Sequence, residues 1–87
     1  MQYRVEFRPA ALREIRRIPN PFKGRILTAI AALADVPRPP GSVQLQGPKG
    51  FHRVRVGDYR VVYLIEDREL LVCVVRIAHR KDVYGRL

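Results

Sequence analysis

The spacing of the hydrophobic residues changes near the middle of the chain, and this change limits the fold to one class. Between residues 9 and 41, apolar side chains recur every three or four positions, as they do on one face of a helix. From residue 51 onward they alternate with polar residues or form short runs, as they do in strands. Helices followed by consecutive strands indicate an α+β domain, with both helices on one side of an antiparallel-dominated sheet.

A strand and a first helix are predicted for the N-terminal residues. Apolar and charged residues alternate over 3–7, which is typical of a half-buried strand. Pro9 then ends the strand and suits the first turn of a helix. The apolar face of this helix consists of Leu12, Ile15 and Ile18. Pro19 ends it.

The second helix has the stronger pattern. We expect Asn20 to be its N-cap and Pro21 its first helical residue. Its apolar positions, at helical spacing, are Phe22, Ile26, Ile30 and Leu33. Pro37, Pro39 and Pro40 then prevent the helix from continuing. Residues 41–50 have the composition of a loop.

Three consecutive strands are predicted after this loop. They cover Phe51–Val56, Tyr59–Glu66 and Leu70–Ile77. Gly57 and Asp58 fit a two-residue hairpin turn, with glycine where positive φ is needed. The order is β-α-α-β-β-β, and 87 residues suffice for one domain spanning 1–87.

The composition is strongly basic and points to a polyanionic partner. Lys and Arg number 17 against 8 acidic residues, a net charge of +9, and 14 of the cations are arginine. Arginine grips phosphate oxygens in a bidentate fashion, so nucleic acid is the simplest partner. The single Cys73, the absence of a signal-peptide pattern and the lack of a long apolar run indicate a cytoplasmic protein with no membrane association.

The predicted hairpin brings three arginines onto one face of the sheet. A turn at residues 57–58 pairs Arg55 with Arg60 and Arg53 with Val62. Like charges directly opposite each other destabilise a sheet by up to ~1 kcal/mol. Two interpretations are open: a solvated face on which the arginines repel weakly, or a phosphate-binding cluster. Tyr59 and Tyr63 share the opposite face and are expected to be core residues.

Segments 51–63 and 79–84 resemble the RelE/ParE superfamily of type II toxin–antitoxin toxins, and the likeness covers nearly the whole chain. The resemblance implies the RelE-like fold and one of two activities. RelE-like members cut messenger RNA in the ribosomal A site, whereas ParE-like members poison DNA gyrase and generally lack the cationic nuclease residues. In this chain, the positions that match the RelE nuclease pattern are Arg53, Arg55, Arg60, Arg80 and Tyr84. The match favours a ribosome-dependent endoribonuclease.

The resemblance also implies a mechanism without a metal or other cofactor. The ribose 2′-OH attacks the adjacent phosphate, leaving a 2′,3′-cyclic phosphate and a 5′-OH. Arg60 and Arg80 are the candidates for stabilising the charge of the transition state. Arg53 and Arg55 stand where lysines are frequent in the family, and because arginine does not lose its proton, they are expected to orient and neutralise the phosphate.

The general acid and base remain open at this point. Tyr84 is the candidate that the family pattern supplies, and neighbouring cations would have to lower the pKa of its hydroxyl. His79 is a second candidate, because histidine is the usual residue for acid–base catalysis near neutral pH, but it is equally compatible with a structural role in the C-terminal turn. His52 alternates away from Arg53, toward the helices or solvent. The residues expected to contact RNA are Arg53, Arg55, Arg60, Lys49, Lys81 and Arg76.

Several partners follow from the resemblance. A cognate antitoxin would neutralise the toxin, the ribosome and messenger RNA would be its targets, and the toxin–antitoxin complex would bind operator DNA through the antitoxin. Two alternatives belong to other classes: a gyrase-inhibiting toxin, and a non-catalytic module that binds RNA or the ribosome. The co-occurrence of the five matched residues weighs against the gyrase inhibitor.

Overall fold

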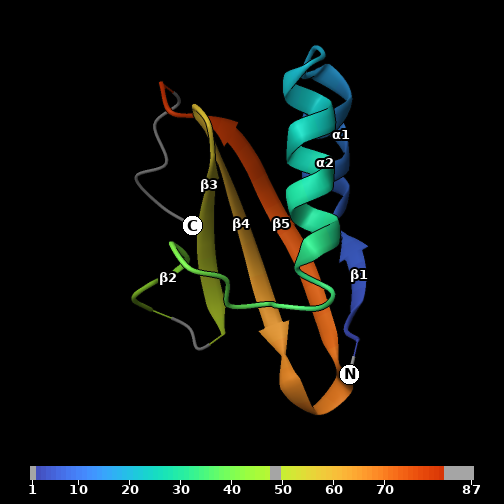
Figure 1. Cartoon of the computed structure of the whole chain (residues 1–87), viewed down its shortest axis with the longest axis vertical. Coiled ribbons are helices and arrows are strands. Elements are labelled where there is room, and N and C mark those ends of the chain that lie inside the picture. Colours follow the sequence, from blue (N-terminus) through green and yellow to red (C-terminus); the bar gives the residue numbers. More distant parts are fainter. Residues whose placement is uncertain (1, 48–49, 82–87) are drawn as a thin grey trace.

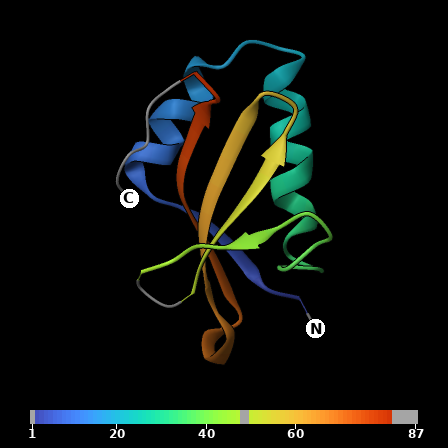
Figure 2. The ribbon, with the colours of Figure 1, turned by 90° about the vertical axis from the view of Figure 1, so that its left-hand side faces the viewer.

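The computed structural model describes residues 2–47 and 50–81. Its elements in chain order are β1 (Arg4–Phe7), α1 (Pro9–Arg17), α2 (Phe22–Ala32), β2 (Val43–Gln44), β3 (Phe51–Val56), β4 (Tyr59–Glu66), η1 (Asp67–Glu69) and β5 (Leu71–His79). Both helices lie on the same side of the sheet (Figure 1), and Figure 2 views the molecule with the strands in front of them. The predicted α+β arrangement is confirmed. Among the described residues, no helix is long and apolar enough to cross a membrane.

The five strands form one sheet in the order β1-β5-β4-β3-β2. β3, β4 and β5 pair antiparallel with their neighbours, as the consecutive strand patterns predicted. β5, the last strand, lies beside β1, the first strand, and the two pair in parallel, with Val5 opposite Val72. The chain between β1 and β5 includes both helices, so this pairing places the helices across one face.

The core lies between the two helices and that face. Its residues from the helices and their C-caps are Ala11, Ile15, Ile18, Ile26, Ile30 and Leu33, and its strand residues are Val61, Tyr63, Ile65, Val72, Val74 and Ile77. Each fully buried side chain of this size stabilises the fold by roughly 1.5–3 kcal/mol. The predicted burial of Tyr63 is confirmed, since it is fully enclosed and its hydroxyl donates to the Pro37 carbonyl at 2.7 Å.

Two predicted core positions are wrong. Leu12 is 38% exposed and Phe22 is 43% exposed. Ala11, four residues before Ile15, occupies the inward position in α1 and turns Leu12 toward the rim. Phe22 is the first residue of α2, and it packs beside Tyr59 rather than beneath the helices.

The predicted cap of α2 is also wrong. Pro21, not Asn20, is the N-cap residue, and no side chain caps the helix. The Lys23 amide donates to the Pro19 carbonyl at 3.1 Å, and the Arg25 amide makes the first regular helical bond, to the Pro21 carbonyl at 3.2 Å. The first of these bonds satisfies one of the amides that a side-chain cap would otherwise serve.

One strand was not expected, and both ends of β5 differ from the prediction, since it begins at Leu71 and not at Leu70. The segment expected to be loop contains β2, in which Val43 pairs with Arg53 and remains 43% exposed. Two residues are too few to produce an alternating pattern in the sequence. β5 continues to His79, beyond the predicted end at Ile77, because the long β4 supplies pairing partners as far as Tyr59.

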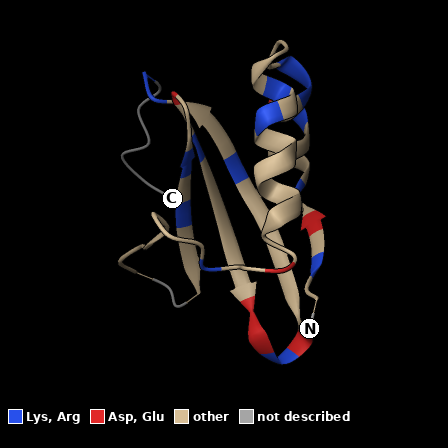
Figure 3. Cartoon of the chain, in the orientation of Figure 1, with Lys and Arg blue, Asp and Glu red and all other residues tan. Residues whose placement is uncertain are grey.

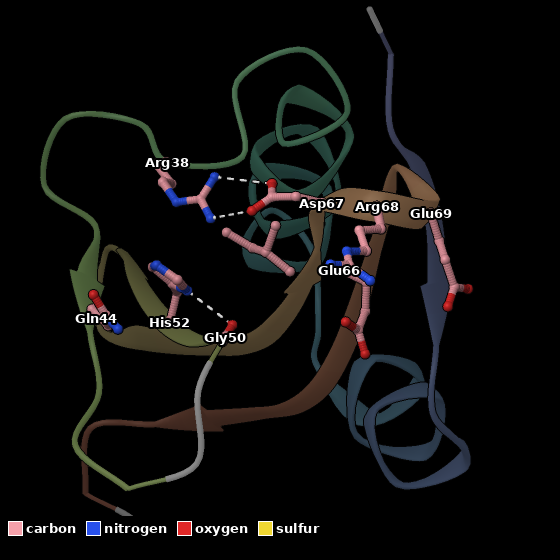
Figure 4. Close-up of a pocket in the computed structure, with 9 residues that line it drawn as sticks. Arg38, Gln44, Gly50, His52, Glu66, Asp67, Arg68 and Glu69 are labelled. Atoms are coloured by element: carbon pink, nitrogen blue, oxygen red, sulfur yellow. Dashed lines mark hydrogen bonds and ion pairs between the residues drawn. The ribbon is translucent and has the colours of Figure 1, made fainter.

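A polar network fastens the loop after α2 to the β4–β5 hairpin (Figure 4). The two guanidinium nitrogens of Arg38 donate to the two carboxylate oxygens of Asp67, at 3.3 and 2.9 Å. The Tyr3 hydroxyl donates to the same carboxylate at 2.7 Å. Nearby, the buried His52 places Nδ1 2.9 Å from the Gly50 carbonyl and stacks on Tyr63. His52 therefore faces the helix side, one of the two directions expected.

The network predicts a pH dependence of stability. Arg38, and then Tyr3, hold the pKa of the Asp67 carboxyl below its ordinary value of 3.8. A depressed folded-state pKa stabilises the protein above the unfolded pKa, and the contribution is lost as pH falls through the folded pKa. We expect Asp67→Asn to lower the urea midpoint at pH 6 and to have a shrinking effect below pH ~4. Glu69→Gln, on the same hairpin, is the control. A difference between Asp67→Asn and wild type that stays constant with pH would contradict this account.

A side chain at position 50 is expected to destabilise the fold, because it would collide with neighbouring residues. The φ of Gly50 is +91°, and a Cβ there would lie 2.9 Å from Leu64 Cδ1 and 3.1 Å from the Ile65 carbonyl oxygen. Gly41 has nearly the same φ, +90°, with nothing within 4 Å of such a Cβ. We expect Gly41→Ala to cost roughly 1–2 kcal/mol from its backbone conformation alone. Gly50→Ala should cost distinctly more in urea unfolding, and equal costs would show that the contact with Ile65 is unimportant.

Candidate functional site

The β3–β4 hairpin gathers arginines on the face that the helices leave uncovered. Arg55 pairs with Arg60, and Arg53 pairs with Val62, so the predicted register is confirmed. The turn has Gly57 at φ +60°, while Asp58 has no positive φ. Glycine at the first central position is typical of a type II′ turn, whose twist matches that of paired strands. The turn thus fixes which side chains face each other.

The three arginines of this hairpin repel one another. Partial burial, and then the charges of Arg55 and Arg60, lower the pKa of the Arg53 guanidinium. Among the described residues, none of the three forms an ion pair with a carboxylate. Their positive charge is therefore not neutralised within the described part of the chain.

The side chain of Arg60 has a buried hydrogen-bond donor without an acceptor among the described residues. Its Nε is fully buried, yet it makes no hydrogen bond to any described residue. Leaving a buried donor unpaired costs about 1–3 kcal/mol, and more when the group is charged. An anion that accepts from this nitrogen would remove the cost once the side chain shifts enough to expose it.

A small cavity joins Arg60 to Arg55 and to Arg80 beyond the end of β5. It encloses about 90 Å³, and its lining consists of Arg55, Gly57, Asp58, Tyr59, Arg60 and Arg80. The Arg80 amide donates to the Asp58 carbonyl at 2.6 Å. This bond anchors Arg80 at the turn, and it depends on the extension of β5 to His79. Three predicted site residues are thereby brought together.

Asp58 is a site residue that the sequence reasoning treated only as part of a turn. Its Oδ1 lies 3.7 Å from Arg80 Nε, with both side chains largely exposed. Such an exposed pair contributes at most about 1 kcal/mol and is easily displaced. The carboxylate therefore occupies a position that an incoming anion could take over. The signal in the sequence was an acidic residue immediately beside a cationic cluster.

His79 lies on the opposite face of the sheet from Arg60. It pairs with Tyr59, and the two rings meet edge to face at 5.2 Å. Its Nδ1 accepts a hydrogen bond from the Lys81 amide at 3.1 Å. The structure thus favours the structural alternative for His79, because the ring orders the C-terminal turn and does not line the arginine cavity.

Arg76 is likewise not brought into the cluster. It donates from Nε to Glu14 Oε2 at 3.0 Å, and Glu14 Oε1 accepts the Ile77 amide at 2.7 Å. Glu14 thereby satisfies a donor on the edge of β5 and pairs with Arg76 at once. Lys81 lies exposed just after Arg80. Lys49 was predicted to bind RNA and Tyr84 to act in catalysis, and both lie outside the described residues.

Charge is segregated along the sheet (Figure 3). Basic residues follow β3 and the adjoining ends of β4 and β5, whereas carboxylates gather at the β4–β5 hairpin. A larger hollow of about 520 Å³ lies at the acidic end, around Asp67 and His52 (Figure 4). Its Arg38 is already paired with Asp67. We therefore place the anion site at the smaller cavity, where Arg55 and Arg60 lack such a partner among the described residues and the contact of Arg80 with Asp58 is weak. Among the described residues, no three His, Cys, Asp or Glu side chains gather as metal ligands.

Comparisons with known proteins agree on one family. The model of the ParE toxin of the type II toxin–antitoxin system parDE matches residues 5–84. Toxin RelG of Mycobacterium tuberculosis is 34% identical, over 99% of this chain and 100% of RelG. Toxin RelE of the same organism is 31% identical, over 94% of this chain and 86% of that toxin.

Solved structures show the same fold. The RelE–RelB complex of Pyrococcus horikoshii matches with a TM-score of 0.82 and 24% identity, covering 95% of this chain and 100% of that one. The RelBE2 toxin–antitoxin complex of Mycobacterium tuberculosis matches with a TM-score of 0.67 and 32% identity, covering 94% and 95% of the two chains. Both are complexes of a toxin with its antitoxin.

Removing one of the opposed arginines is expected to stabilise the fold and to weaken anion binding. Arg55→Gln removes the charge opposite Arg60, so we expect it to raise the free energy of unfolding by up to ~1 kcal/mol at low salt. The gain should shrink as added salt screens the repulsion. The same variant should lose part of the stabilisation that inorganic phosphate gives the wild type.

Arg13→Gln, on the exposed side of α1, is the matched control with the same change in net charge. Urea unfolding with and without phosphate, at equal ionic strength, measures both effects. A destabilised Arg55→Gln with an undiminished phosphate effect would contradict the assignment.

Proposed function

Because this chain belongs to the RelE/ParE superfamily of type II toxin–antitoxin toxins, we propose that it is a RelE-like endoribonuclease that cleaves messenger RNA in the ribosomal A site. The observation that carries the proposal is the cavity shared by Arg55, Arg60 and Arg80. Three guanidinium groups around so small a space suit a phosphate, and the buried Nε of Arg60 needs an acceptor. A gyrase inhibitor would not require this arrangement.

In the proposed reaction the ribose 2′-OH attacks the adjacent phosphorus, the bond to the 5′-oxygen breaks, and a 2′,3′-cyclic phosphate and a 5′-OH remain. Negative charge grows on the phosphate oxygens as the new bond forms. Arg60 and Arg80 would stabilise this charge from fixed positions, while Arg55 and Arg53 hold and orient the strand. Guanidinium groups supply positive charge without a metal or other cofactor.

A group other than the arginines has to remove the proton of the 2′-OH and to protonate the leaving 5′-oxygen. Arginine stays protonated, so the four arginines cannot deprotonate the 2′-OH. His79 faces away from the cavity, and its Nδ1 already accepts the Lys81 amide. We therefore assign the acid–base role to Tyr84, the tyrosine that the family pattern supplies, and this role requires cations that lower the pKa of its hydroxyl. The ribosome would contribute by positioning the message against this small cavity, and the proposal therefore includes a requirement for the ribosome.

The proposed partners follow from the same charges. An antitoxin with acidic segments would cover the arginine face and compete with RNA for it. The similar solved complexes of toxin with antitoxin support a cognate antitoxin for this chain. Through that antitoxin the complex would bind operator DNA.

Translation in vitro with mapping of message ends tests the proposal. Wild type should produce cuts within codons in the A site and none on naked RNA. Arg60→Ala/Arg80→Ala should reduce cleavage by at least about 100-fold, since removing a single transition-state donor costs on the order of 10²–10³ in rate.

Arg13→Ala/Arg16→Ala removes the same charge from the exposed face of α1 and should cleave normally. An intact message with folded wild-type protein would overturn the proposal, and inhibition of gyrase supercoiling would then indicate the ParE-like activity.

A further inference from the structure

An exposed aromatic ring lies just across the β3–β4 turn from the arginine cavity. Phe22 begins α2 and is 43% exposed. Its ring centroid lies 5.9 Å from that of Tyr59, with the planes tilted by 41°. Tyr59 in turn meets His79 edge to face at 5.2 Å. Tyr59 contacts both other rings and supports Phe22 from one side, while the rest of the Phe22 ring is exposed.

The ring forms one wall of a separate hollow of about 230 Å³, lined by Phe22, Arg25, Val56, Gly57 and Asp58. Gly57 and Asp58 also line the arginine cavity. The two hollows therefore meet at the turn, one on each side of it. A ligand that lies across the turn can fill both.

The lining of this hollow combines a flat apolar surface with polar groups at its rim. Phe22 and Val56 offer the apolar surface, Arg25 offers donors, and the Asp58 carboxylate offers an acceptor. Unstacked bases of single-stranded RNA are bound in this way, by stacking on aromatic rings and by hydrogen bonds to their edges. Carboxylates in particular accept from the exocyclic amino group of cytosine.

We propose that the Phe22–Arg25 hollow is a base-binding subsite for a nucleotide adjacent to the phosphate held by Arg55, Arg60 and Arg80. The inference rests on the proposed function and extends it, because it identifies a contact to RNA on the helix side of the turn. It favours RNA over a protein segment because the hollow offers a ring for stacking and shares Gly57 and Asp58 with the cavity of Arg55, Arg60 and Arg80. A base in the hollow would fix the register of the strand relative to the reacting phosphate.

The chain contains no tryptophan, so a single introduced tryptophan can serve as a fluorescent probe. Phe22→Trp places a single fluorophore in the hollow, and Leu27→Trp places one on another side of α2, where Leu27 is 42% exposed. A short single-stranded RNA with every ribose 2′-O-methylated binds without being cleaved. We expect this RNA to quench Phe22→Trp and to leave Leu27→Trp unchanged. Inorganic phosphate alone should quench neither.

Anisotropy of the same labelled RNA measures affinity. Phe22→Ala should weaken binding about 5-fold or more, as expected for loss of one stacked base, whereas Leu27→Ala should not. If Arg60→Ala abolishes binding while Phe22→Ala and the Phe22→Trp signal are without effect, the subsite is wrong and the phosphate site stands. If wild type does not bind RNA at all, both are overturned. Quenching of Phe22→Trp by an acidic antitoxin but not by RNA would reassign the ring to a protein partner.

Discussion

Arg55 and Arg60 lie opposite each other across the β3–β4 hairpin, and the rest of the structure has to offset this unfavourable pair. Their repulsion destabilises the sheet by up to ~1 kcal/mol, and the unpaired Nε of Arg60 adds to the cost. The other face of the same strands offsets it. There Val61 and Tyr63 are fully buried beneath the helices, each contributing more than the repulsion removes. The two faces of β4 thus have opposite roles, one stabilising the fold and one presenting charge.

The arginines of the β3–β4 hairpin differ from two structural arginines of this chain in lacking a carboxylate partner. Arginines that position elements are paired with carboxylates: Arg38 with Asp67, and Arg76 with Glu14. The arginines of the β3–β4 hairpin have no such partner among the described residues. Positions that keep unfavourable electrostatics in an otherwise well-packed domain are where ligands are expected to act. Asp58 is intermediate, because its weak contact with Arg80 can yield to an anion.

Much of this arrangement could be predicted from the sequence, since it depends on local patterns. A glycine-aspartate turn between alternating strands determines the register and hence the shared face of Arg53, Arg55 and Arg60. Features that depend on distant contacts could not be predicted. The parallel return of β1 to β5, the pairing of Glu14 with Arg76 and the orientation of His79 all require the tertiary structure. Phe22 matched the helical period, but its position at the helix start decided its exposure.

The central claim is that Arg60 is held ready for a phosphate, and its buried Nε–H group can be observed directly. NMR of arginine Nε–H groups in uniformly ¹⁵N-labelled protein, titrated with 2′-O-methylated RNA, reports whether that proton gains an acceptor. Arg60→Lys identifies the signal by its absence. We predict that the Arg60 Nε–H signal shifts and becomes protected from solvent exchange as RNA binds. If the signal is unchanged while other arginine signals move, the phosphate lies elsewhere and the assignment of the cavity is wrong.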